Sequence, residues 1–208
     1  MINSIKNISK LFLIPILIGM LSTFSLPPYD FFFINFFTFP VLFFFIVSID
    51  NKLSSFIFGW MFGFGYFISS LYWIANSLTF DETFKPLIPL SIIIIPLFLG
   101  IFYGLITLIA SLIKIKKNLS SILIFSLIFA IIEFIRGHVL GGFPWNLIVY
   151  SLTNYLYSIQ ILSVIGTYSL NLLSITLFTL PIILFFKQRA KFILMGIFLL
   201  LAIILFNN

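Results

Sequence analysis

Long apolar runs separated by short polar interruptions make up almost the whole chain. A membrane-spanning helix needs about 20 apolar residues to cross a ~30 Å hydrocarbon core. The runs therefore predict seven spanning helices, at residues 11–25, 31–49, 53–78, 87–113, 119–140, 154–186 and 190–206. The connections between them are too short to hold an extramembrane domain. The pattern predicts an all-α fold, a polytopic membrane helical bundle forming a single transmembrane domain over residues 1–208.

The first apolar run has a second interpretation. It follows Lys6 and Lys10, and a charged region followed by an apolar one is also typical of a secretory signal peptide. The run ends at Pro27 and Pro28 without a clear small-x-small cleavage site. We therefore favour a retained first span over a cleaved leader.

Composition excludes a water-soluble globule. Of the 208 residues, 62% are hydrophobic and 8% are charged, and the mean hydropathy is +1.28, whereas soluble domains carry about 25% charged residues. The sequence has no cysteine, which excludes disulfides, thiolate metal sites and a cysteine nucleophile within these residues. No dinucleotide, phosphate-loop or metal motif is present, so the sequence predicts no cofactor and no metal site.

The positive charges alternate between connections and so predict an orientation. Cytoplasmic loops of membrane proteins are enriched in Lys and Arg, which places the N-terminus in the cytoplasm and the C-terminus outside. The predicted cytoplasmic set is Lys6, Lys10, Lys52, Lys114, Lys116, Lys117, Lys187, Arg189 and Lys191. Because the net charge of +6 is spread over short gaps, the sequence predicts no nucleic-acid partner.

The segment from Glu133 to Trp145 gathers unusual charges at the end of the fifth predicted helix. Charged residues near a membrane segment are costly and mark candidate functional sites. Glu133 and Arg136 are three residues apart, so they share a helix face and can pair. Two hypotheses remain open: an interfacial ion pair whose arginine snorkels outward, or an arginine that holds a lipid phosphate in a bidentate contact while Glu133 fixes its orientation.

Glycine and proline after Arg136 predict a break in this helix. Gly142 permits backbone angles that other residues resist, and Pro144 ends a helix that continues through it. The break predicts a loop that returns to the membrane surface, where Phe143 and Trp145 anchor it or contact acyl chains. A serine hydrolase built on His138 is not indicated, because no triad geometry is recognisable.

Small residues recur at four-residue spacing in the third and fourth predicted helices, at Gly59, Gly63, Gly100 and Gly104. Such spacings let helix backbones approach closely in lipid. Packing within the bundle is the first interpretation. The alternative is a non-catalytic membrane partner or assembly subunit that docks another membrane protein through these faces. Solute transport is a poorer hypothesis, since no interrupted helix pair with convergent polar groups is recognisable.

The order of residues from Glu133 to Ser151 resembles a known family. The chain has a Glu-x-x-Arg-Gly pattern, then Gly142, Phe143, Pro144 and Trp145, then Tyr150 and Ser151. This order is similar to the fifth helix and following loop of bacterial apolipoprotein N-acyltransferases, and weaker similarity runs from about residue 20 to the C-terminus. Val149 departs from the pattern, which tends to have glycine there.

The resemblance implies a role in lipoprotein N-acylation in the bacterial inner membrane, with the C-terminus in the periplasm. In this family, a nitrilase-like domain with a Glu-Lys-Cys set transfers an acyl group from a phospholipid to the N-terminal amine of a diacylglyceryl-lipoprotein. That domain is missing from these 208 residues. We expect the chain to position both substrates, to work with a separate nitrilase-domain chain, or to be a truncated remnant.

The resemblance also implies which residues and partners take part. The expected partners are membrane phospholipid and a lipidated apolipoprotein, and no catalytic residue is expected. Glu133 and Arg136 are expected to contact the headgroup. The other expected substrate-binding residues, which shape the lipid entry, are Gly142, Phe143, Pro144, Trp145 and Tyr150.

Overall fold

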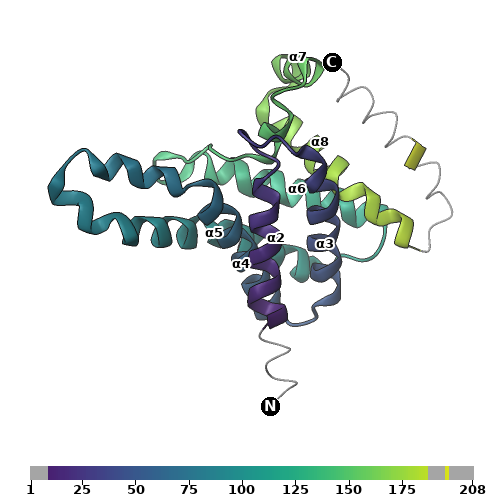
Figure 1. The fold of residues 1–208 in the computed structure, drawn as a ribbon. Coiled ribbons are helices and arrows are strands. Elements are labelled where there is room, and N and C mark those ends of the chain that lie inside the picture. Colours follow the sequence, from purple (N-terminus) through teal and green to yellow (C-terminus); the bar gives the residue numbers. More distant parts are fainter. Residues whose placement is uncertain (1–8, 187–194, 197–208) are drawn as a thin grey trace.

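The fold was obtained as a computed structural model, which describes residues 9–186 together with Met195 and Gly196. The described residues form helices and contain no strand, which confirms the predicted all-α class (Figure 1). The α-helices are α2 (Ile14–Thr23), α3 (Asn35–Ser48), α4 (Lys52–Ser70), α5 (Ile88–Ile113), α6 (Leu119–Arg136), α7 (Leu156–Ile165) and α8 (Thr167–Thr179). Shorter 3₁₀ segments include η3 (Tyr72–Thr79), η4 (Glu82–Leu87), η5 (Val139–Gly141), η6 (Ile148–Leu152) and η7 (Leu180–Phe185).

Four helices of the described chain are long and apolar enough to cross a membrane. They are Lys52–Ser70, Glu82–Ile113, Leu119–Arg136 and Thr167–Phe185. The first two predicted spans form shorter apolar helices, Leu11–Thr23 and Phe32–Ser48. The seventh predicted span, 190–206, lies outside the described residues apart from Met195 and Gly196. The helical class of the bundle is thus as predicted, whereas the number of seven membrane crossings stays a prediction.

Glycines bring the backbones of α2, α4 and α5 together. A Cβ atom at Gly63 would lie 2.8 Å from the Cα of Gly100, and one at Gly19 would lie 2.0 Å from the carbonyl oxygen of Phe62. The small-residue faces of α4 and α5 therefore pack against each other. In lipid no hydrophobic effect drives helices together, so such close packing is needed to hold them. These faces are occupied within the chain and are not free to dock another membrane protein, whereas the role of a non-catalytic partner or assembly subunit stays a prediction.

Two predicted spans end earlier in the structure than their apolar runs suggest. The run 53–78 ends as a helix at Ser70, where the serine hydroxyl bonds to the carbonyl of Tyr66 and the Trp73 indole caps the carbonyl of Ser70. The run 119–140 ends as a helix at Arg136. Local polar bonds mark the end at Ser70, and Gly137 follows directly at the end at Arg136.

The predicted span 154–186 is divided into two helices. Gly166 has φ +82°, a left-handed conformation that favours glycine, and it separates α7 from α8. Figure 1 shows α7 at one end of the molecule and α8 running along the bundle. Only the part from Thr167 to Phe185 is therefore a candidate span.

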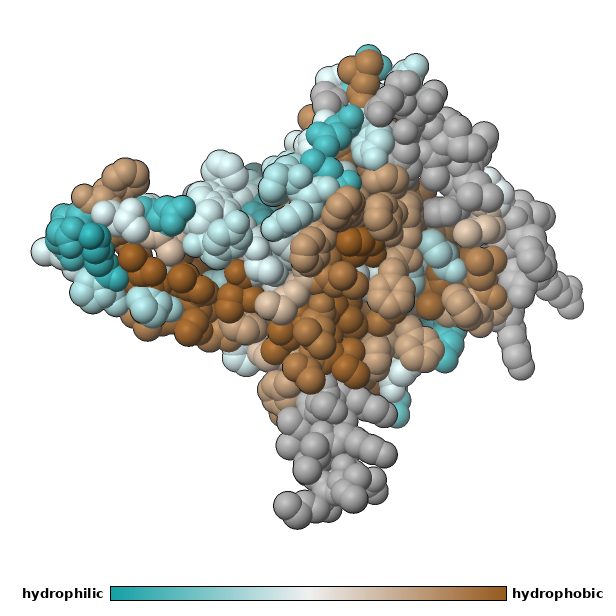
Figure 2. Space-filling model, viewed as in Figure 1, coloured by the Kyte–Doolittle hydropathy of each residue, from teal (hydrophilic) through white to brown (hydrophobic). Residues whose placement is uncertain are grey.

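The segment between α4 and the middle of α5 projects from the bundle as a hairpin arm (Figure 1). Figure 2 shows apolar residues over the middle of the bundle and along one side of the arm, with polar residues at its tip. Exposed apolar side chains such as Leu90, Ile94 and Phe98 are costly in water. They are the surface expected of helices that face lipid.

Candidate functional site

A glycine turn after α6 begins the loop that carries most of the predicted site residues. Gly142 has φ +77°, and a Cβ atom there would lie 2.4 Å from the carbonyl oxygen of Gly137. Only glycine fits this close approach with this backbone angle. The amide of Phe143 then donates to the carbonyl of Arg136 at 3.0 Å, which folds the loop back onto the helix end, as the glycines and Pro144 predict.

Arg136 holds this loop from inside the protein. Its side chain and that of Glu133 are fully buried, with 3.5 Å between Nη2 and Oε1. Nη1 donates to the carbonyl oxygen of Phe143 at 2.6 Å and to that of Trp145 at 3.0 Å. The predicted Glu133–Arg136 pair is thus confirmed, and the hypothesis of an arginine that snorkels outward is wrong because loop carbonyls bind the guanidinium.

Residues from three other helices complete a buried polar network around Glu133. Its Oε1 accepts from the hydroxyl of Tyr103 at 3.0 Å, and its Oε2 accepts from the amide of Asn171. The Asn171 side-chain oxygen in turn accepts the backbone N–H of Val149 at 2.9 Å. The Tyr66 hydroxyl donates to the carbonyl of Asn146 at 3.0 Å. The loop is therefore fixed at residues 143, 145, 146 and 149.

The guanidinium of Arg136 also lies against two aromatic rings. Its Cζ is 5.2 Å from the ring centroid of Phe67 and 6.0 Å from that of Phe143. Its Nε is buried and has no hydrogen-bond partner among the described residues. Cation–π attraction strengthens when the cation is desolvated. The two rings therefore help to stabilise the guanidinium charge, although its Nε makes no hydrogen bond. The arginine thus contacts four residues, Glu133, Phe67, Phe143 and Trp145, which leave it little freedom to move.

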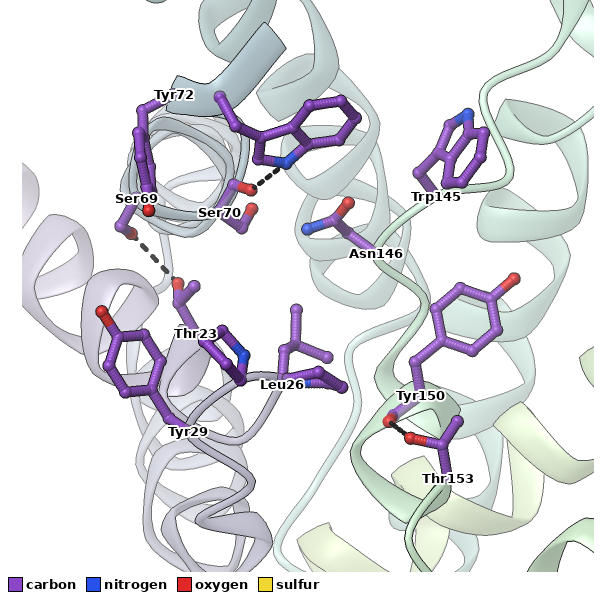
Figure 3. Close-up of a pocket in the computed structure, with 13 residues that line it drawn as sticks. Thr23, Leu26, Tyr29, Ser69, Ser70, Tyr72, Trp145, Asn146, Tyr150 and Thr153 are labelled. Carbon is purple, nitrogen blue, oxygen red and sulfur yellow. Dashed lines mark hydrogen bonds between the residues drawn. The ribbon is translucent and has the colours of Figure 1, made fainter.

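Two cavities flank the loop. The first, which we call the Trp145 cavity, has a volume of about 510 Å³ and lies between the ends of α2 and α4 and the loop (Figure 3). The second, which we call the Phe143 cavity, has a volume of about 410 Å³ and lies among the arm, α5 and the loop. Apart from Arg136, its lining is apolar or glycine, including Phe98 and Phe143. Neighbouring loop residues therefore face different cavities.

The structure places the predicted site residues in three groups. Gly142, Phe143 and Arg136 line the Phe143 cavity, and Trp145 and Tyr150 line the Trp145 cavity. Pro144 lies between them and accepts the Tyr150 hydroxyl on its carbonyl oxygen at 3.1 Å. Glu133 lines neither cavity, since it is fully buried behind Arg136.

Tyr150 stays protonated near neutral pH. Burial raises the pKa of this phenol above its usual range, and the nearby Tyr168 raises it further. The hydroxyl can therefore donate to Pro144 throughout the physiological pH range. This bond joins the start of the loop to the 3₁₀ segment η6 that follows it.

His138 lies apart from the network. Its Nδ1 pairs with the carbonyl oxygen of Phe134 at 2.7 Å, and its ring packs against those of Phe134 and Tyr168. No cluster of three or more His, Asp or Glu residues capable of holding a metal ion occurs in the described part of the chain. The contacts that the structure shows around the loop are hydrogen bonds, one buried ion pair and aromatic contacts.

Sequence reasoning missed Tyr66, Tyr103 and Asn171. Each lies in a predicted helix 30 or more residues from Glu133, so no local spacing connects them. The one signal available in the sequence was a polar Asn171 inside an apolar run, because polar groups within a membrane segment need partners.

Replacing Asn171 by leucine should destabilise the protein. The change removes the bond to Oε2 of Glu133, whose Oε1 keeps Tyr103 and Arg136, and it leaves the Val149 amide without its partner. An unsatisfied buried polar group costs about 1–3 kcal/mol. Thermal unfolding in detergent measures the loss. The matched control is Asn76→Leu at an exposed position, and equal unfolding midpoints for both variants would rule out the network as described.

Comparison with known proteins identifies the family to which this chain is similar. The model of the family described as apolipoprotein N-acyltransferase N-terminal domain matches residues 18–180, which include the whole loop and Asn171. Apolipoprotein N-acyltransferase of Rhodopseudomonas palustris is 37% identical over 180 residues, covering 82% of this chain and 33% of that protein. The Brucella melitensis protein of the same name is 35% identical over 176 residues, which are 80% of this chain and 33% of that protein. The Allorhizobium ampelinum protein of the same name is 32% identical over 189 residues, which are 86% of this chain and 36% of that protein. The chain thus spans about a third of the length of these relatives.

Proposed function

Because this chain belongs to the apolipoprotein N-acyltransferase N-terminal domain family, we propose that it forms the membrane-embedded part of such an acyltransferase. In this role it holds a phospholipid and a lipidated apolipoprotein for N-acylation. The observation that carries the proposal is the loop from Gly142 to Tyr150, which buried side chains fix between two cavities. A rigid support of this kind is what precise positioning of two substrates requires.

The Phe143 cavity suits an acyl chain. Its lining is almost entirely apolar, and it borders the exposed apolar side chain of Phe98 on α5. A lipid chain can enter such a cavity from the membrane without crossing a polar barrier. Phe143 and Gly142 then shape the entry. Glu133 and Arg136 contribute by fixing the loop, and the phosphate contact first expected of Arg136 would require its bonds to Phe143 and Trp145 to open.

A thiolate nucleophile of the kind that this family uses would have to come from outside these 208 residues. A covalent acyl transfer needs an activated nucleophile with a base in reach, and the chain contains no cysteine to supply a thiolate. The proposal therefore includes a nitrilase-like catalytic body, in a separate chain or in further sequence, above the end of the bundle where the loop lies. Phospholipid and lipidated apolipoprotein would meet between the two.

A chimera tests this function. The matched third of the Brucella melitensis relative is replaced by this chain, and the product is expressed in cells depleted of their own apolipoprotein N-acyltransferase. Mass spectrometry of a lipoprotein N-terminus should then show an added acyl chain. A chimera that reaches the membrane at the level of the parent but adds no acyl chain would contradict the proposal.

The proposed orientation places the membrane domain, residues 1–208, in the bacterial inner membrane with its N-terminus in the cytoplasm. Lys52 and the lysines at 114, 116 and 117 then face the cytoplasm, as positive-inside orientation requires. A phosphatase reporter fused after Asn208 should be active in the periplasm. A fluorescent reporter at the same position should remain dark, and a bright cytosolic signal would reverse the orientation.

A further inference from the structure

A third hollow lies on the outer face of the bundle, between α3 and η7. This hollow, which we call the α3–η7 groove, has a volume of about 380 Å³, and its lining is apolar throughout. Phe37, Pro40 and Phe44 of α3 and Pro181 and Phe185 of η7 belong to the lining. Its three phenylalanines at 37, 44 and 185 are exposed. Such an apolar surface is costly in water and fits a hydrocarbon chain.

The length of the groove is close to the thickness of one leaflet of a bilayer. The lining runs along α3 from Phe36 to Phe44, which is about 12 Å at 1.5 Å rise per residue. One leaflet contributes about 15 Å to the hydrocarbon core. The groove can therefore take one acyl chain of a lipid whose headgroup lies beyond Phe44.

A lysine lies at that end of the groove. The ammonium Nζ of Lys117 is 5.1 Å from the centroid of the Phe44 ring, and cation–π attraction stabilises it there. Lysine has three N–H donors, so an oxygen ligand can bind the ammonium as well. Neither of the ion pairs found among the described residues includes Lys117. The groove thus ends at a cation that no described carboxylate neutralises.

More positive charge gathers at the same end of the bundle. The beginning of α4 lies beside the end of α5, where Ser55 and Thr107 exchange two hydrogen bonds. The connections at this end carry three further exposed lysines, Lys52, Lys114 and Lys116. Within the described connections 49–52 and 114–118, Asp50 is the one acidic residue. Clusters of lysine next to a membrane segment attract negatively charged headgroups.

We propose that the α3–η7 groove binds an anionic phospholipid, with the phosphate at Lys117 and one acyl chain along Phe44 and Pro40. Lysine binds a phosphate as a point charge, and the neighbouring lysines favour a headgroup with a net negative charge over a zwitterionic one. In the proposed orientation this lipid belongs to the cytoplasmic leaflet. The inference goes beyond the proposed function, because this lipid supports the packing of α3 on η7 and takes no part in acyl transfer.

The groove is separate from the loop that carries the candidate substrate site. Lys117 precedes α6, whereas Arg136 ends that helix. The 18 residues of α6 span about 27 Å. A headgroup at Lys117 therefore lies at the opposite end of α6 from the Phe143 cavity.

Lipid competition tests the proposal. The purified protein in detergent receives equal amounts of phosphatidylglycerol and phosphatidylcholine with the same acyl chains, and native mass spectrometry measures how much of each lipid is retained. Phosphatidylglycerol should be preferred, and added salt should reduce the preference because it screens exposed charges. Equal retention of the two lipids would overturn the proposal.

Two exposed positions locate the bound lipid. Lys117→Gln should lower the preference for phosphatidylglycerol about fivefold, the contribution of one lysine beside anionic lipid. Phe185→Ala should lower the retention of phosphatidylglycerol, because the acyl chain loses one wall of the groove. The matched controls are Lys85→Gln and Phe80→Ala on the arm, which are exposed and lie outside the groove. Neither control should change retention.

The other possible results each contradict the groove site. A preference that survives Lys117→Gln would place the phosphate elsewhere. A preference that falls with Lys117→Gln but not with Phe185→Ala would mean diffuse attraction to the lysines, and a dimer that Phe185→Ala dissociates would mean that a second copy covers the groove. The chimera with the Brucella melitensis relative should still acylate its lipoprotein when it carries Lys117→Gln, so failure of this site and failure of the proposed function are distinguishable.

Discussion

Replacing Arg136 by alanine is expected to destabilise the protein by about 3–5 kcal/mol, the usual cost of breaking a buried ion pair by removing one partner. The change leaves the Glu133 carboxylate buried without its cation, and it removes both bonds that hold the carbonyls of Phe143 and Trp145. Thermal unfolding in detergent measures the stability. Retention of phospholipid by the purified variant should fall as well, because the loop loses its support.

The control for this experiment is Lys85→Ala. Lys85 pairs with Glu82, but both side chains are well exposed, at 44% and 84%, and exposed ion pairs contribute little. The Lys85 variant should unfold and bind lipid like the unmodified protein. If the Arg136 variant does the same, then Arg136 neither supports the fold nor belongs to the site.

A double variant separates stability from lipid binding. Glu133→Leu with Arg136→Met removes both charges, and apolar replacement of a buried ion pair is often neutral or stabilising. We expect the double variant to recover part of the lost stability, because no unpaired charge is left buried while Tyr103 and Asn171 still lose the acceptor that Glu133 provides. It should still bind phospholipid poorly, because methionine cannot donate to the loop carbonyls. Recovery of both properties would show that the loop does not depend on Arg136.

Replacing Gly19 by alanine is expected to produce the second large effect. The added Cβ atom would lie 2.0 Å from the carbonyl oxygen of Phe62 and 2.8 Å from the amide nitrogen of Tyr66. Both are backbone atoms, so α2 and α4 must move apart. Overpacking of this kind costs about 1–3 kcal/mol or more, and the shift also disturbs the contact between Thr23 and Ser69.

Gly196→Ala is the matched control for the helix contact, because a Cβ atom at Gly196 meets nothing within 4 Å. Both variants add one methyl group to an apolar segment. The Gly19 variant should lower the unfolding midpoint clearly, whereas the Gly196 variant should not. Similar midpoints would mean that α2 and α4 are not in the close contact described.

The positions of the predicted spans could be derived from the sequence because hydrophobic length is a local property. The apolar runs locate α4, α5 and α6, and three-residue spacing predicts the Glu133–Arg136 pair. Helix ends were harder to predict. The end of α4 coincides with hydrogen bonds of Ser70 and Trp73 that an apolar pattern does not encode.

The partners of the candidate site could be predicted only in part. The loop residues follow one another in sequence, so their pattern is visible there. The contacts of Asn171 with Glu133 and Val149 depend on how α8 packs against α6 and η6, which no local pattern encodes. Which residues line which cavity could not be predicted either. The arm and the loop come from distant parts of the chain, so no local pattern brings them together.

Photocrosslinking tests most directly whether the fixed loop is a lipid site. A phospholipid with a diazirine near the start of one acyl chain is added to the protein in nanodiscs, and the sample is irradiated. Peptide mass spectrometry then maps the crosslinked positions on the protein. The account predicts labelling concentrated around Phe143 and Val139, reduced by excess unlabelled phospholipid and lost in the Arg136→Ala variant. Labelling spread evenly over the exposed faces of α3 and α5, with none on the loop and no competition, would contradict it.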